Sequence, residues 1–173
     1  EDLAIQKRVD RPAFLQSQNI TYSLTIETSE YRFVDNVAVT DTIPNSVCPL
    51  GSANFDLHSA PECAPNGRNP SVPYAVPPVE HPDGTFTVTF NLGHLDHNTT
   101  LTIMLPAADR TNYQSGGINT NPTASNDSIS NTVQVQGDLT VICAPADPNC
   151  TGAGTPISHD GALAAYAVRE GGD

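Results

Sequence analysis

The feature that most constrains the fold of this chain is an alternation of apolar and polar residues with a period of two. The apolar positions fall in successive groups: Leu3, Ile5 and Val9; Ile20, Tyr22, Leu24 and Ile26; Val37, Val39 and Ile43; Phe86, Val88, Phe90 and Leu92; Leu101, Ile103 and Leu105; and Ile129, Val133 and Val135. This pattern is typical of strands that bury one face. Sustained helical periodicity does not occur. In a chain of 173 residues, strands at this spacing predict one all-β domain, a sandwich.

Turn-forming residues separate the expected strands at 10–12, 44–46, 81–84 and 91–98. The stretch 48–80 carries many of the 15 prolines, and because proline removes ladder donors we expect an irregular insert and a variable surface there. Beyond Gly137, 139–143 can form another strand. The segment 162–168 reads as a small-residue strand or a short helix, and a closing strand is preferred. The domain over 1–173 thus has a core at 2–137, the insert at about 48–80 and a C-terminal extension at 138–173.

The four cysteines form two local pairs, which allow three disulfide connectivities. Each pair flanks a loop rich in proline and asparagine, where a short disulfide would hold irregular backbone. We therefore expect Cys48–Cys63 and Cys143–Cys150. Neither spacing matches a zinc site, and an even number of loop cysteines indicates an oxidising compartment.

The charge balance argues against polyanionic partners. The chain has a formal net charge of −12, which would repel nucleic acid and anionic membrane surfaces. No stretch approaches the roughly 20 apolar residues that span a bilayer. The sequence opens at Glu1 in a strand-like pattern without a signal peptide, so we expect a piece of a longer chain whose export signal or anchor lies elsewhere.

Three polar residues interrupt the apolar faces of their strands. Lys7 falls in phase with Leu3 and Ile5, Asp41 with Val39 and Ile43, and Asn131 with Val133 and Val135. An amine, a carboxyl and a carboxamide are therefore all predicted to point into the core. Burying an isolated charge there costs several kcal/mol, and an unpaired carboxamide costs about 1–3 kcal/mol, so the three groups must compensate one another.

Two arrangements satisfy that requirement. One is a non-covalent triad, with a Lys7–Asp41 ion pair and Asn131 hydrogen-bonded beside it. The other removes the charges by chemistry. Burial favours a neutral amine and a neutral acid, and the amine of Lys7 could then attack the side-chain carbonyl of Asn131 while Asp41 stabilises the oxyanion and passes protons to the leaving ammonia. Asn126 is a fallback acceptor, but its turn-like setting favours Asn131.

The residues in these positions carry a family resemblance. Lys7 in AIQKRVD, Asp41 in NVAVTDTIP and Asn131 in SISNTVQV resemble, in that order, the isopeptide-forming domains of Gram-positive pilins and adhesins. The similarity extends to the related Ig-like repeats of large bacterial surface proteins and covers roughly 2–137. It implies an Ig-like β-sandwich with a Lys–Asn crosslink between the first and last core strands and the acid on a middle strand. The disulfide-bearing insert and the segment after Gly137 depart from the family pattern.

The resemblance implies a structural stalk or spacer of an extracellular, cell-wall-associated bacterial surface protein or fimbria, with neighbouring domains of the same protein as its partners. Its chemistry would be a single intramolecular turnover, without a cofactor. The alternative is an adhesin head that contacts host protein or glycan through the 48–80 insert, where Tyr74 could present an aromatic face. The interpretation as an enzyme that acts on an external substrate is not supported, because the sequence contains no recognisable hydrolase or phosphate-binding motif.

Other polar clusters carry weaker signals. His94 and His97 with Asp96 contain metal-ligating types, but the setting reads as a hairpin loop without a third ligand. Asn54 with Asp56, and 126–128, lack the spacing of a calcium loop and read as turns. The glycosylation sequons at 19–21, 98–100 and 126–128 matter only in a eukaryotic secretory setting. We therefore expect no metal site.

Overall fold

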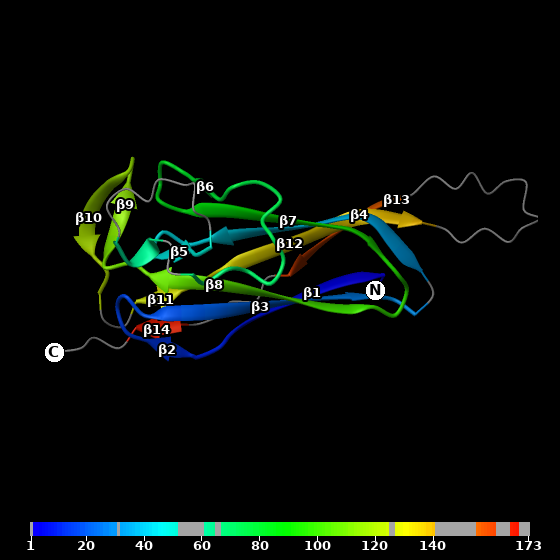
Figure 1. The fold of residues 1–173 in the computed structure, drawn as a ribbon, viewed down its shortest axis with the longest axis horizontal. Helices are drawn as coiled ribbons and strands as arrows, with labels where there is room; N and C mark the ends of the chain where they lie inside the picture. The colour runs from blue at the N-terminus through cyan, green and yellow to red at the C-terminus, as the bar shows by residue number, and fades with distance from the viewer. Residues whose placement is uncertain are drawn as a thin grey trace, which may run out of the picture.

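The structure is a computed structural model that describes residues 2–30, 32–51, 61–64, 67–124, 127–140, 155–161 and 167–169. Two antiparallel sheets pack face to face along the length of the molecule (Figure 1). The four-stranded sheet has the order β1 (Leu3–Val9), β3 (Asn19–Thr28), β8 (Thr100–Asp109) and β5 (Val47–Pro49). The five-stranded sheet has the order β13 (Thr155–Gly161), β12 (Thr132–Thr140), β4 (Phe33–Ile43), β7 (Phe86–Leu95) and β6 (Val79–Glu80). The predicted all-β sandwich is confirmed.

Two smaller sheets lie at one end of the sandwich (Figure 1). The strands β11 (Ser128–Ile129), β14 (Ala167–Arg169) and β2 (Ala13–Phe14) form a three-stranded sheet in which β14 runs parallel to β2. A hairpin of β9 (Asn112–Ser115) and β10 (Ile118–Pro122) projects beside it. The hairpin turns at Gly116 and Gly117, whose positive φ angles of 58° and 77° suit a tight two-residue connection.

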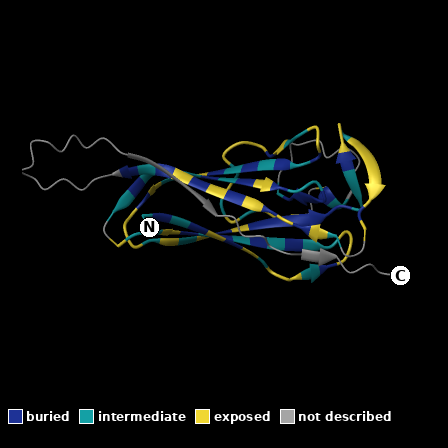
Figure 2. Ribbon diagram, turned by 180° about the vertical axis from the view of Figure 1, so that it is seen from behind, coloured by how far each residue is buried: buried dark blue, intermediate teal, exposed yellow. Residues whose placement is uncertain are grey.

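The core fills the space between the two main sheets. Buried and exposed residues alternate along β1, β3 and β4, as period-two spacing requires, and the inward faces appear as dark bands in Figure 2. Several aliphatic and aromatic side chains are fully enclosed, among them Ile20, Leu24, Ile26, Val39, Ile43, Phe86, Phe90 and Ile103. The alternation therefore located the strands and the face that each of them buries.

The predicted turn at 91–98 was placed too early. β7 continues through Leu95, and its register against β4 shifts between Asn91 and Gly93. Gly93 has a φ of 68°, so a glycine bulge bends the strand without ending it. The chain turns instead at residues 96–99, where Asn98 adopts a φ of 52°.

The C-terminal part differs from the predicted order of strands. Leu139 belongs to β12, which runs unbroken past Gly137, so 139–143 does not begin a separate strand. A Cβ at position 137 would lie 2.5 Å from Val34 Cγ1, so glycine here permits close approach to β4. The edge strand β13 was missed because its sequence, TPISHDG, is polar and lacks alternation. The predicted strand at 162–168 is present at Ala167–Arg169, and its remainder lies outside the described residues.

The predicted disulfide Cys48–Cys63 is confirmed, with the two Cα atoms 5.8 Å apart. It joins β5 to the short 3-10 helix η1 (Pro61–Cys63). The insert is more regular than predicted, because β5 begins it and β6 ends it. The predicted Cys143–Cys150 pair lies outside the described residues.

Candidate functional site

Lys7 points into the core from the four-stranded sheet. It lies opposite Leu24 in the antiparallel pairing of β1 with β3, and only 1% of its surface is exposed. Its Nζ lies 4.4 Å from the centroid of the Tyr22 ring. Lys7 is also the only lysine in the sequence. The chain has thus placed its single primary side-chain amine in the interior.

Asp41 meets this amine from the opposite sheet. It lies in β4 between Val133 of β12 and Val88 of β7, and it is fully buried. The Nζ atom of Lys7 donates to both carboxylate oxygens, at 2.6 Å to Oδ1 and 2.5 Å to Oδ2. The predicted inward positions of Lys7 and Asp41 are therefore correct, and the pair connects the two layers.

Asn131 lies next to this pair along the sheet. It immediately precedes β12 and is not itself within a strand, although its side chain is fully buried as predicted. Asn131 lies two residues before Val133, which pairs with Asp41, so continuing the strand pairing by one residue would place it diagonally on the same inward face, at a separation of roughly 7–8 Å. Neither Nδ2 nor Oδ1 of Asn131 has a hydrogen-bond partner among the described residues. A buried carboxamide without partners costs about 1–3 kcal/mol.

Burial drives both members of the ion pair toward their neutral forms. Desolvation lowers the pKa of Lys7 to about 8, and the charge and hydrogen bond of Asp41 only partly oppose this shift. Desolvation likewise raises the pKa of Asp41 against the opposing effect of Lys7. Both shifts favour a free amine beside a protonated acid over the charged pair.

The arrangement supplies the parts that amide exchange needs. A neutral amine is the nucleophile, an unpartnered carboxamide is the electrophile, and a carboxyl group can hold and return a proton. The groups come from β1, β4 and the residue before β12, so folding brings them together and excludes water. Proximity of this kind replaces a bimolecular encounter with an intramolecular one.

The structure contains a second buried ion pair that the sequence pattern does not predict. Arg110, just after β8, is fully buried, and its Nη2 donates to Glu80 Oε1 at 2.8 Å. Its Nη1 donates to the carbonyl oxygens of Asn45 and Gly84, each at 3.2 Å, and the guanidinium lies 4.8 Å from the Phe86 ring centroid. Arg110 follows a strand end and breaks no alternation, so the sequence pattern gives no signal for it.

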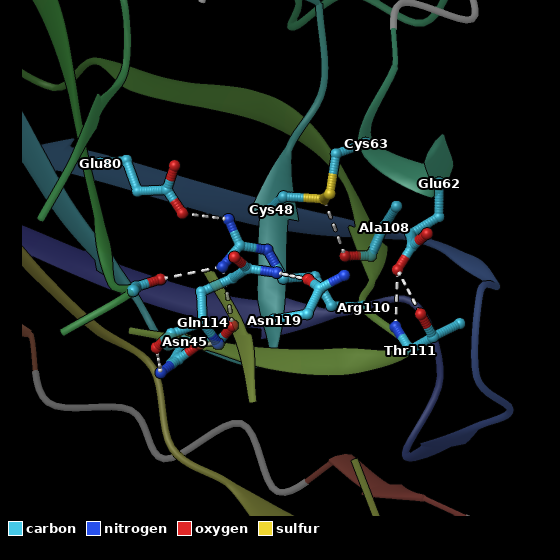
Figure 3. The surroundings of a disulfide bond; sticks show 11 residues. Asn45, Cys48, Glu62, Cys63, Glu80, Ala108, Arg110, Thr111, Gln114 and Asn119 are labelled. Atoms are coloured by element: carbon cyan, nitrogen blue, oxygen red, sulfur yellow. Dashed lines mark hydrogen bonds and ion pairs between the residues drawn. A yellow bond between two sulfur atoms is a disulfide. The ribbon is translucent and has the colours of Figure 1, made fainter. Parts of the chain in front are cut away.

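This second pair helps to hold the insert in place (Figure 3). Glu62, beside Cys63, accepts from the backbone nitrogen of Thr111 at 2.6 Å and from its hydroxyl at 3.1 Å. Glu80, at the other end of the insert, is held by Arg110. Two points of the insert, Glu62 within it and Glu80 at its end, are therefore attached to the same corner after β8.

The remaining candidate residues do not join the buried site. His94 lies exposed on β7, with Nδ1 2.6 Å from Asp35 Oδ1 and Nε2 3.1 Å from Asp96 Oδ1. His97 is exposed in the following turn. In the described part of the chain, no group of three or more His, Cys, Asp or Glu side chains is placed to hold a metal ion. The fallback acceptor Asn126 lies outside the described residues.

Comparison with known proteins gives no family assignment. No family profile matches the chain, and no curated protein matches it. One similar structure is an inactive mutant of a GH20 exo-β-N-acetylglucosaminidase from Vibrio harveyi, with a TM-score of 0.43 and 10% identity over 97% of this chain and 19% of that one. Another is the sporulation control protein Spo0M of Bacillus subtilis, with a TM-score of 0.33 and 6% identity over 98% and 50%. AvmM, which catalyses macrocyclisation in alchivemycin A biosynthesis, has a TM-score of 0.38 and 8% identity over 94% and 89%.

These similarities are too weak to support an inference about activity. Any inference about activity must therefore rest on the geometry of Lys7, Asp41 and Asn131.

The helices of the described residues include none with the length and apolar character of a membrane span.

Proposed function

We propose that this chain is a self-crosslinking structural module of an extracellular surface protein, in which Lys7 and Asn131 form an amide bond with the help of Asp41. The observation that carries the proposal is the pairing of a buried, easily neutralised amine with a buried carboxamide that has no described hydrogen-bond partner. A merely structural asparagine in a core is normally hydrogen-bonded. Here the buried carboxamide of Asn131 has no described hydrogen-bond partner, and this is the feature that requires an explanation.

The reaction balances without any other reactant. Proton transfer from the Lys7 ammonium to Asp41 leaves a neutral amine and a neutral acid. The lone pair of Nζ attacks Cγ of Asn131, and the acid donates a hydrogen bond to Oδ1 as negative charge develops there. A proton from Nζ reaches Nδ2 through the Asp41 carboxyl, the Cγ–Nδ2 bond breaks, and ammonia leaves. The product is a Lys7–Asn131 amide.

The bond would join the two layers of the sandwich covalently. β1 belongs to the four-stranded sheet and β12 to the five-stranded sheet, so the amide would connect strands that no backbone hydrogen bond links. A crosslink over this sequence distance removes much conformational freedom from the unfolded chain. Resistance to unfolding and to tension is the function that follows, and it suits a stalk or spacer of a bacterial surface adhesin or fimbria.

The location is part of the same proposal. The Cys48–Cys63 disulfide is compatible with an oxidising, extracellular setting. Attachment to a bacterial cell wall rests on the family resemblance of the residues around Lys7, Asp41 and Asn131.

Intact mass of the purified protein tests the proposal. We expect the wild type to be lighter than its sequence mass by one ammonia, beyond the hydrogens lost to disulfides. Asn131→Leu, which preserves side-chain volume, should show no such deficit. Glu80→Gln serves as the matched control, since it alters the other buried ion pair and should keep the deficit. A wild-type protein at full mass would refute the crosslink.

A further inference from the structure

The insert spans the open side of the sandwich between the two sheets. It leaves through β5, an edge strand of the four-stranded sheet, and returns through β6, an edge strand of the five-stranded sheet. Ser71 N donates to Met104 O of β8 at 3.0 Å, and Ala75 N donates to Thr89 O of β7 at 2.7 Å. The chain therefore crosses from one sheet to the other within residues 71–75.

Tyr74 lies within this crossing and turns its ring inward. The ring stacks on Phe90 with centroids 5.4 Å apart, and its hydroxyl donates to Leu50 O at 2.6 Å. Tyr74 is half-buried, whereas Phe90 is fully buried. The sequence had suggested an outward aromatic face for Tyr74, and this interpretation is wrong because the ring packs against the core.

Phe90 connects Tyr74 to the reactive pair. It lies opposite Val39 in the pairing of β7 with β4, and Asp41 lies opposite Val88. These buried residues share the inward face of the sheet, so the Tyr74 ring packs on the same face from which Asp41 projects. Burial, together with the charge of Asp41, raises the pKa of Tyr74, which agrees with this placement.

The backbone of the insert is shaped to hold the crossing in position. Gly51 has a φ of 87°, and a Cβ there would lie 2.7 Å from Pro70 Cδ and 2.8 Å from Arg68 O. Only glycine permits the returning segment 68–70 to lie against 50–51. The same contact supports Leu50, whose carbonyl oxygen holds the Tyr74 hydroxyl.

From this geometry we propose that Tyr74 is a positioning residue that closes the site over Asp41 and keeps water from the acid and the amine. The inference rests on the proposed function for its chemical consequence, since water at Asp41 would stabilise the charged, unreactive forms of both groups. The crossing segment 71–75 is then a lid over the crosslinking site. The insert is a departure from the pattern of the isopeptide-forming domains that this sequence resembles. It would nevertheless assist the same crosslinking reaction.

The lid can be tested without the crosslink. In the Asn131→Leu background no bond can form, and 15N-lysine labelling gives a single side-chain signal because Lys7 is the only lysine. Tyr74→Ala should raise the pKa of Lys7 toward its ordinary value, as water enters and Asp41 ionises more readily. Tyr74→Phe keeps the ring and should change it little. Tyr113→Ala, which removes another half-buried tyrosine, is the matched control.

Gly51→Ala gives an independent route, because it displaces the returning segment without altering Tyr74. It should shift the pKa of Lys7 in the same direction as Tyr74→Ala. An unchanged pKa in both variants overturns the lid. If one variant fails to fold, the other decides the outcome.

The wild-type background then tests the chemical consequence. When folding is started from chain produced unfolded and therefore not yet crosslinked, Tyr74→Ala should lose ammonia at least tenfold more slowly than the wild type, as followed by intact mass, while Tyr113→Ala keeps the wild-type rate. Equal rates for Tyr74→Ala and wild type would overturn the role in the reaction. A wild type that never loses ammonia would refute the crosslink instead, and the pKa measurement would still decide whether Tyr74 is a lid.

Discussion

Two buried ion pairs in the described part of the molecule each join a cation to a carboxylate, but they differ in burial and in hydrogen-bond partners. Lys7 and Asp41 are both fully enclosed and come from opposite sheets. Arg110 is enclosed, but its partner Glu80 keeps 11% of its side chain exposed. The arginine also donates to two backbone carbonyl groups and lies over an aromatic ring. Among the described residues, the lysine donates only to the Asp41 carboxylate, and it lies near a carboxamide that has no hydrogen-bond partner there.

The difference shows how the choice of cation decides whether a buried pair is structural or reactive. Burial lowers the pKa of Arg110, yet a guanidinium remains protonated in proteins, and its Nη1 and Nη2 groups donate to fixed acceptors. Lysine loses its proton far more readily when buried, and its neutral form is a nucleophile. An ion pair that can neutralise itself next to an amide is therefore poised for chemistry, whereas the arginine pair secures the corner after β8.

The largest expected effect comes from Asp41→Ala. It should abolish the loss of ammonia and also leave the Lys7 amine buried without its carboxylate. Removing one partner of a buried pair costs about 3–5 kcal/mol, and loss of the crosslink lowers stability further. Denaturant unfolding and intact mass check both effects. Retention of the ammonia deficit in Asp41→Ala would show that the acid is not needed, and the two pairs would then differ less than their geometry suggests.

The disulfide beside the arginine pair should contribute the next largest effect. Replacing both Cys48 and Cys63 by alanine frees a loop with a sequence separation of 15. Closure of a loop of this length is worth about 3 kcal/mol in the chain-entropy account. Thermal and denaturant unfolding under identical conditions measure the loss. Unchanged stability would mean that the insert is held mainly by Glu62 and Arg110. A Glu62→Ala variant should then lower the free energy of unfolding more than loss of the disulfide does.

The same two regions show how far sequence reasoning reaches. Lys7, Asp41 and Asn131 could be predicted as a group because each replaces an apolar residue in a period-two pattern, so the anomaly itself marks the site. The roles of Arg110 and Tyr74 could not be predicted from the sequence. Arg110 follows the end of a strand, and Tyr74 lies in a proline-rich insert whose path depends on contacts with distant strands. The edge strand β13 was missed for a related reason, since its pairing with β12 is set by backbone hydrogen bonds and not by an apolar face.

Weakening the arginine pair alone should have a smaller effect than breaking the lysine pair. Glu80→Gln keeps the shape of the side chain and one acceptor for Arg110 but removes the opposite charge. Because Arg110 keeps its bonds to Asn45 and Gly84, we expect a loss of about 1.5–3 kcal/mol, the range for hydrogen bonds to charged groups. Denaturant unfolding measures the loss, and intact mass should be that of the crosslinked wild type apart from the substitution. A missing ammonia deficit in Glu80→Gln would mean that the two pairs are coupled.

The pH dependence of stability offers the finest distinction between a charged pair and a bonded one. In Asn131→Leu, Lys7 remains an amine whose pKa is about 8 in the folded state and 10.5 in the unfolded state. Between these values the unfolded chain binds more protons than the folded chain, so stability should rise with pH across that window. In a crosslinked wild type, Lys7 is an amide and has no proton to bind. The wild-type protein should therefore show no rise in stability from Lys7 across this pH window.

Tyr74 and the other titrating groups are present in both proteins, and the difference between the two stability curves therefore reports Lys7 together with the Asp41 carboxyl that is coupled to it. We expect Asn131→Leu to gain stability relative to the wild type from about pH 8 to pH 10.5, as measured by denaturant unfolding at closely spaced pH values. Parallel curves would contradict the crosslink, because they would require Lys7 to titrate alike in both proteins. The arginine pair provides the internal standard, since a guanidinium stays protonated throughout this range and Glu80→Gln should leave the difference intact.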